Sequence, residues 1–275
     1  MIKQQCNAAL QDNPIFLSFV ETLPQTFDSL GEIVHDARNQ LRKVEVADWG
    51  IPNLQEVMIK KYHGLFFFQR IWYSFFRAPK CRRAYNNTVE LRHRGLPAVE
   101  EVACVEVWSH GLFKYGFFIS KVGEGERMDS LIVKLKIQGE NDEIQKITHK
   151  AALLVAHVHQ RGVLYKDMNP GNLLCTHSST NNDWQISLID TNRARISASD
   201  SPLPLASCIP EIILMNPILG IEDAFINDYL HIRSLYSAQL CKDIRHIQYR
   251  KHERKRPLKE RLGRFKAWYF KWLKR

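Results

Sequence analysis

The stretch "GVLYKDMNPGNLLC", residues 162–175, decides the fold of this chain, because it joins two regions of different periodicity through a polar loop. Upstream of it, apolar residues recur every three or four positions and predict a long amphipathic helix ending near Gly162; these are Ile144, Ile147, Ala151, Leu154 and Val158. Downstream, the apolar segments "NLLC" and "WQISLID" flank the polar loop "THSSTNND", which predicts a hairpin. The loop between helix and hairpin carries Asp167 and Asn172, five positions apart.

The region before this helix is dominated by strand patterns. A first hairpin is predicted from "GEIVHDA" and "RKVEV", a third strand from "EVMIKKY", and a second hairpin from "VACVEVW" and "YGFFISK" across "SHGLFK". Between them, "CRRAYNNTVELRHRG" predicts a helix that stops at Gly95, with Pro97 beyond it. More helical material is expected after "ASDSPLPLAS".

The order of these elements predicts an α+β fold. A sheet-rich first part with one helix precedes a mainly helical second part, which is the order of a two-lobed protein-kinase-like fold. We therefore predict an N-lobe over residues 1–121, a C-lobe that carries the polar loop over residues 122–250, and a basic amphipathic C-terminal helix over residues 251–275.

Four residues stand where phosphoryl transfer needs them. Transfer of the γ-phosphoryl group of ATP requires Mg²⁺ against the phosphates, a cation on the α- and β-phosphates, and a carboxylate that orients the acceptor hydroxyl. Lys60 ends the strand motif "VMIK", close to the kinase V-A-I-K, and Glu90 lies in the middle of the predicted helix, placed to pair with it. Asp167 and Asn172 lie on the loop, and Asp190 ends the second strand of the following hairpin. Each feature alone is common, whereas the whole set in this order is specific.

The chain resembles the lipopolysaccharide core kinases, the Kdo/heptose kinase family, from about Phe27 to Arg195. The resemblance is carried by "ARNQLRKVEV", by "MIKKYHG" with "CRRAYNNTVELRHRGLPAVEEVA", by "GVLYKDMNPGNLL" and by "LIDTNRARI". It implies an ATP- and Mg²⁺-dependent sugar kinase with a protein-kinase-like fold. It also implies the site roles: Lys60 binds phosphates and Glu90 positions it, Asp167 is the catalytic base, and Asn172 and Asp190 hold Mg²⁺.

Two departures from the kinase pattern bear on activity. Tyr165 and Lys166 replace the usual His-Arg before the catalytic Asp, at a supporting position where a tyrosine packs and still donates a hydrogen bond. No G-x-G-x-x-G loop is present, so we expect the phosphates to be covered by "HDARN", through backbone amides or Arg38. The segment "CIPEI" (208–212) superficially resembles the kinase Ala-Pro-Glu and carries little weight.

The net charge of +10 is concentrated at the C-terminus. Residues 242–275 hold 14 Lys and Arg and 3 Asp and Glu, which leaves the rest of the chain close to neutral. In "PLKERLGRFKAWYFKWLKR" the apolar and aromatic residues follow one helical stripe and cations fill the remainder, as in a helix that lies on an anionic membrane surface. Two alternatives are a helix docked on the body and RNA binding, although no nucleic acid partner is expected.

The segment "GLFFFQRIWYSFFRAPK" (64–80) has too many adjacent aromatic residues for one buried helical face. Either some are exposed beside the active cleft, which would suit a lipid-linked acceptor, or the segment packs between the tail and the N-lobe. The sequence has no apolar run long enough to span a bilayer. Its six scattered cysteines, without a CxxC pair, predict reduced thiols in a cytosolic protein and no zinc site.

Together these features predict a kinase that phosphorylates an inner-core sugar of lipopolysaccharide, Kdo or heptose, at the inner face of the cytoplasmic membrane. Two alternatives remain open at this point: a protein Ser/Thr/Tyr kinase, and a catalytically silent kinase-like binding module.

Overall fold

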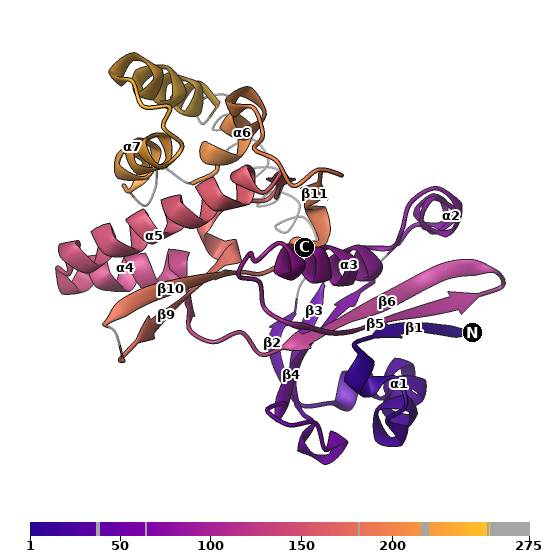
Figure 1. Cartoon of the computed structure of the whole chain (residues 1–275). Coiled ribbons are helices and arrows are strands. Elements are labelled where there is room, and N and C mark those ends of the chain that lie inside the picture. Colours follow the sequence, from indigo (N-terminus) through magenta and orange to yellow (C-terminus); the bar gives the residue numbers. More distant parts are fainter. Residues whose placement is uncertain (37–38, 64, 181, 216–219, 252, 254–275) are drawn as a thin grey trace, which may run out of the picture.

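The computed structural model describes residues 1–36, 39–63, 65–180, 182–215, 220–251 and 253. Within this part of the chain, the N-terminal half forms an antiparallel sheet with the strand order β1-β5-β6-β4-β3-β2 (Figure 1). Its strands are β1 (Ile2–Cys6), β2 (Glu32–Asp36), β3 (Gln40–Glu45), β4 (Glu56–Tyr62), β5 (Glu101–Ser109) and β6 (Leu112–Lys121). Both predicted hairpins and the third strand are confirmed.

The turn between β5 and β6 is tighter than the sequence pattern suggested. His110 and Gly111 both have positive φ angles, 52° and 74°, and Ser109 already pairs with Leu112. Successive left-handed residues match the twist of a two-residue hairpin, which is why the pairing continues to the tip.

Residues 1–26, to which the sequence patterns assigned no element, form β1 and the helix α1 (Pro14–Thr26). β1 pairs along β5 and covers that edge of the sheet. α1 begins after Asn13, whose side chain accepts a hydrogen bond from the backbone N–H of Phe16 at 2.9 Å. Phe16, Val20 and Leu23 then pack on the apolar residues of the sheet to form one hydrophobic core.

Two helices follow β4. α2 (Phe67–Phe75) has no buried residue and projects from the side of the sheet (Figure 1). α3 (Lys80–His93), which the sequence predicted, packs against β5 and β6 through Cys81, Ala84 and Tyr85. Its C-terminal end, with Leu91, belongs to the core of the C-terminal half and so connects the sheet to the helices.

The C-terminal half contains α4 (Met128–Gln138), α5 (Asn141–Gln160), α6 (Leu205–Ile212), α7 (Glu222–Ile232) and a further helix at 238–251. α5 is the predicted amphipathic helix, and Gly162 follows it with a left-handed φ of 71°. The predicted hairpin is formed by β9 (Leu173–Ser178) and β10 (Asp183–Leu188), next to the short strand β7 (Glu126–Arg127). Another short pair joins β8 (Val163–Leu164) to β11 (Arg195–Ile196).

The α+β fold is thus confirmed as an N-terminal antiparallel sheet followed by helices, while the limits proposed for the lobes stay a prediction. The predicted amphipathic helix at 251–275 falls almost wholly outside the described residues. Among the helices that are described, none combines the length and the hydropathy needed to cross a membrane.

Candidate active site

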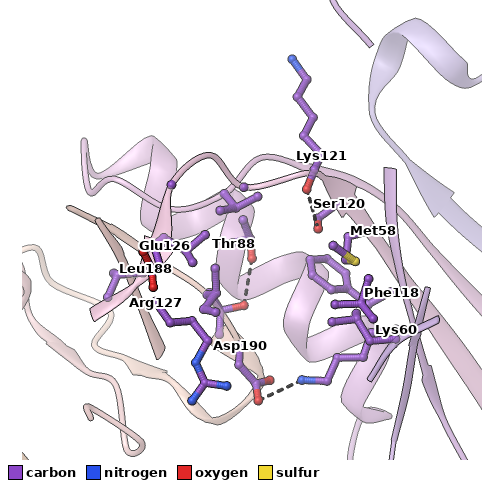
Figure 2. Close-up of a pocket in the computed structure, with 18 of the residues that line it drawn as sticks. Met58, Lys60, Thr88, Phe118, Ser120, Lys121, Glu126, Arg127, Leu188 and Asp190 are labelled. Atoms are coloured by element: carbon purple, nitrogen blue, oxygen red, sulfur yellow. Dashed lines mark hydrogen bonds and ion pairs between the residues drawn. The ribbon is translucent and has the colours of Figure 1, made fainter. Parts of the chain in front are cut away.

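Lys60 and Asp190 meet at the centre of the site. Alternation along β4 buries Val57 and Ile59 in the sheet core and leaves Lys60 on the opposite face. Asp190 follows β10 in a left-handed conformation, with φ 64°, which is uncommon outside glycine. The Lys60 Nζ atom lies 2.9 Å from the Asp190 Oδ2 atom, and Figure 2 shows the two side chains reaching toward each other.

The loop after α5 is held together by amides that fix its backbone. Asn169 Nδ2 and Asn172 Nδ2 donate to the carbonyl oxygen of Asp167 at 2.8 and 2.9 Å, and the backbone N–H of Gly171 donates to Asn169 Oδ1 at 3.1 Å. The Asn-Pro-Gly-Asn run therefore sets where the carboxylate of Asp167 points. That carboxylate pairs with Arg193, Nη1 to Oδ2, at 3.2 Å.

Tyr165 supports the site from below. Its side chain is fully buried, and its hydroxyl donates to the backbone carbonyl of Ile189, the residue before Asp190. Burial and the negative charges of Asp190 and Asp167 raise the pKa of Tyr165 well above its usual value, so the hydroxyl stays protonated and remains a donor. The tyrosine thus fills the supporting position and connects the loop to Asp190.

Glu211, in the segment "CIPEI", holds the loop of Asp167 from α6, a contact that no sequence pattern predicted. It is buried on α6 and accepts hydrogen bonds from the backbone N–H groups of Tyr165, at 2.9 Å, and Lys166, at 2.8 Å. His159 Nε2 lies 3.3 Å from the same carboxylate. Lys166 has a φ of 65°, so Glu211 holds the residue before Asp167 in a conformation that a lysine rarely adopts.

The predicted pairing of Glu90 with Lys60 is wrong in this structure. The Glu90 carboxylate pairs with Arg94 of the same helix, Oε1 to Nε, at 2.8 Å. Arg94 also donates to the carbonyls of Arg161 and Ser197 at 2.8 and 2.7 Å, so this pair joins α3 to the C-terminal helices. Residues two apart on a helix point about 200° apart, so another residue faces the site.

Thr88 occupies the place expected of Glu90. It is buried, it lines the cavity that contains Lys60, and its hydroxyl lies 2.8 Å from that of Thr191, beside Asp190. A neutral hydroxyl pair therefore connects α3 to the turn of Asp190, and Lys60 is neutralised by Asp190 itself. Arg38, predicted to cover the phosphates, lies outside the described residues.

An apolar cavity of about 470 Å³ lies next to Lys60 and Asp190 (Figure 2). We call it the apolar cavity after its walls, which include Val34, Leu41, Met58, Val99, Phe118 and Leu188. An apolar cavity whose lining also includes a lysine and a carboxylate fits a nucleotide base followed by phosphates. Carboxylate and amide oxygens are ligands that Mg²⁺ prefers, so Asp190 and Asn172 fit the predicted magnesium role.

A second cavity, of about 390 Å³, is lined mainly by polar and charged residues, among them Asp167. We call it the cationic cavity, because its described lining includes Arg77, Lys80, Arg83, Lys166, Arg193 and Arg195. Asp190 and Tyr62 line both cavities, so the two meet where Lys60 and Asp190 pair. Sequence patterns gave no sign of the cationic cavity, apart from the arginines of "LIDTNRARI".

A second group of metal-ligand atoms lies elsewhere, where Cys81, Cys104 and Glu106 approach within 4.8 Å of one another. Glu106 Oε2 already accepts hydrogen bonds from Arg82 and Trp108, at 2.6 and 3.0 Å. A hydrogen bond to Cys81 and burial raise the pKa of Cys104, which favours the protonated Cys104 thiol over a metal-binding thiolate. All six cysteines are free.

A model of the lipopolysaccharide kinase (Kdo/WaaP) family matches residues 43–200, which include Lys60, Asp167, Asn172 and Asp190. No curated protein matches the chain. Among solved structures, WaaP in complex with acyl carrier protein superposes with a TM-score of 0.60 at 13% identity, over 92% of this chain and 98% of that chain. This similarity shows a common fold.

Proposed function

Because the chain belongs to the lipopolysaccharide kinase (Kdo/WaaP) family, we propose that it transfers the γ-phosphoryl group of ATP, with Mg²⁺, to a hydroxyl of an inner-core sugar, Kdo or heptose. The observation that carries this proposal is the meeting of the two cavities. The apolar cavity suits the adenine and leads to Lys60 and Asp190, and the cationic cavity presents Asp167 on the other side of the same pair.

The proposed reaction assigns one task to each side chain. Lys60 would hold the α- and β-phosphates, and Asp190 and Asn172 would hold Mg²⁺, which when bound would offset the negative charge of the phosphates. Asp167 orients the sugar hydroxyl and accepts its proton as the new oxygen–phosphorus bond forms. The bond between the γ-phosphorus and the bridging oxygen breaks, and ADP leaves with that oxygen.

Labelled ATP tests the reaction directly. The protein would be incubated with γ-labelled ATP, Mg²⁺ and, in parallel, Kdo linked to lipid A, a heptose-containing core acceptor and a generic protein acceptor. We expect label in one of the glycolipids. Label only in protein would favour a protein kinase, and no Mg²⁺-dependent nucleotide binding would favour a catalytically silent module.

We further propose that the protein works on the cytoplasmic side of a membrane, where a lipid-linked acceptor would lie. The support comes from α2 and its flanks, where six aromatic side chains are each more than half exposed: Phe66, Phe67, Phe68, Trp72, Phe75 and Phe76. The opposite side of α2 is attached to the sheet by Arg70, whose Nε donates to the Phe113 carbonyl at 3.1 Å, and by Tyr73, which packs edge-on against Phe113.

This arrangement is the reverse of an ordinary surface helix, because the apolar face points outward. Exposed aromatics next to cationic residues fit the interface of an anionic bilayer, and Arg77 and Lys80 follow α2 directly. The basic segment 251–275 is proposed to bind the same surface.

Replacing Phe68, Phe75 and Phe76 together by serine is expected to lower binding to anionic vesicles by at least about tenfold, since each buried phenylalanine contributes about 2 kcal/mol. Flotation on phosphatidylglycerol vesicles measures this effect. Ile137→Ser serves as the control, because Ile137 is equally exposed but lies on α4. If the triple variant floats like wild type, α2 does not contribute to membrane binding. If the protein truncated after Arg250 floats like wild type, the basic segment 251–275 does not contribute.

A further inference from the structure

We propose that the cationic cavity binds an anionic group of the acceptor, a carboxylate or a phosphate, beside the hydroxyl that Asp167 activates. This inference rests on the proposed sugar-kinase function and narrows its substrate to an acidic acceptor. It starts from an imbalance of charge: six cationic side chains line the described cavity against the two carboxylates of Asp167 and Asp190. Both carboxylates already have cationic partners, Arg193 and Lys60.

Three of the remaining cations, all arginines, come from separate segments of the chain and converge on this cavity. Arg77 follows α2, Arg83 lies on α3, and Arg195 begins β11, yet all three line the same cavity. Within the described residues, none of the three makes an ion pair with a carboxylate. Like charges brought together without counterions repel one another, so the arrangement is stabilised when an anion binds between them.

Arg83 is the most constrained of these cations. Its Nε atom is buried and has no hydrogen-bond partner among the described residues. Burial and the nearby Arg77 lower the pKa of the Arg83 guanidinium, which is the direction expected for a cation that lacks a counterion. A buried, unpaired donor costs free energy that an oxyanion would recover through charge-assisted hydrogen bonds.

The start of α3 adds a second source of positive potential at the same place. The helix begins at Lys80, its N-terminus has no side-chain cap, and its first turn contains no acidic residue. Helix N-termini favour anions, and a cation such as Arg83 in that first turn is unfavourable unless an anion offsets it. The 14-residue α3 therefore presents its positive end to a cavity already rich in cations.

Tyr62 offers a hydrogen-bond donor to the anion at the place where the two cavities meet. It is 4% exposed, it lines both cavities, and its hydroxyl has no hydrogen-bond partner within the described chain. Burial and Asp190 raise its pKa well above the usual value, so it stays a neutral donor. Arg77, Arg83 and Arg195 line the cationic cavity but not the apolar one. We therefore infer that they contact the acceptor and not the nucleotide.

Steady-state kinetics with matched acceptors test this assignment. The variants are Arg195→Ala, which changes an exposed residue of β11, and Arg83→Ala, with Lys114→Ala as the control because Lys114 is exposed on β6 outside the cavity. The acceptors are lipid A-linked Kdo, the same glycolipid with its carboxylates converted to neutral amides, and the same glycolipid after phosphatase treatment. Binding of the free Kdo saccharide, followed by calorimetry, gives a readout that does not depend on turnover.

We expect each cavity variant to raise the KM for the acidic glycolipid by at least about tenfold, the loss expected for one charge-assisted hydrogen bond. The KM for ATP and all constants of Lys114→Ala should stay at wild-type values. If amidation abolishes the difference between wild type and variant, the anion is the carboxylate; if phosphatase treatment does so, it is a phosphate.

Three results would overturn the proposal. The first is a wild-type acceptor KM in Arg195→Ala and also in Arg83→Ala, if that variant folds. The second is an equal rise in KM for the charged and the neutral acceptors, and the third is a rise in the KM for ATP alone. Failure of the sugar-kinase function itself would look different. In that case no glycolipid would be labelled at all, while calorimetry would still report whether the cavity takes up an acidic sugar.

Discussion

Replacement of Asp167 by asparagine is expected to lower kcat for sugar phosphorylation by about 10²–10⁴-fold, the range for removal of a positioned general base. The substitution keeps the size of the side chain but removes its negative charge, and with it both the proton acceptor and the ion pair to Arg193. The loop should hold its shape, because Asn169 and Asn172 donate to the backbone carbonyl of Asp167, at 2.8 and 2.9 Å, and only a longer bond of 3.4 Å from Asn169 reaches its carboxylate. The KM for ATP should change little, since Lys60 and Asp190 are left in place.

Single-turnover transfer from labelled ATP measures this effect without interference from product release. Asp200→Asn provides the matched control, because Asp200 pairs with Arg161 at 3.1 Å and lines neither the apolar nor the cationic cavity. Retention of wild-type kcat by Asp167→Asn would contradict the assignment of Asp167 as the base. An increase in the KM for ATP alone would instead indicate that Asp167 acts on the nucleotide.

Replacement of Glu211 by alanine is expected to destabilise the protein by about 3–5 kcal/mol, the loss typical when one partner of a buried polar network is removed. Its carboxylate is 1% exposed and accepts from the backbone N–H groups of Tyr165 and Lys166. Alanine would leave both donors buried and unpaired, at about 1–3 kcal/mol each. Release of Lys166 from its left-handed conformation should also move Asp167 and lower kcat.

Urea unfolding gives the change in free energy, and kcat measured well below the unfolding midpoint separates the loop effect from loss of folded protein. Glu211→Gln is the informative comparison, because its amide oxygen still accepts a hydrogen bond while the charge is removed. We expect it to lose less stability than the alanine variant. An alanine variant within about 1 kcal/mol of wild type would show that water or a neighbouring group replaces the carboxylate.

The sequence by itself determined the elements whose signal is local. Period-two alternation marked β3 and β4, and the 3–4 spacing marked α5, because burial of one face imposes that period on each element separately. The same signals placed Lys60 at a strand end and put Asp167 and Asn172 on one loop. The family resemblance then supplied roles that spacing alone could not. Residues 1–26 were missed, because β1 is mostly polar and shows no buried face of its own.

Only the tertiary structure decided which side chains face one another. Glu90 and Thr88 lie on the same polar helix, and its packing angle against the sheet turned Thr88 toward the site and Glu90 toward Arg94. Glu211 reaches the loop of Asp167 by a hydrogen bond to Lys166, 45 residues away, which no local period encodes. The cationic cavity forms for the same reason. Its arginines belong to separate elements, and the packing of those elements brings their charges together.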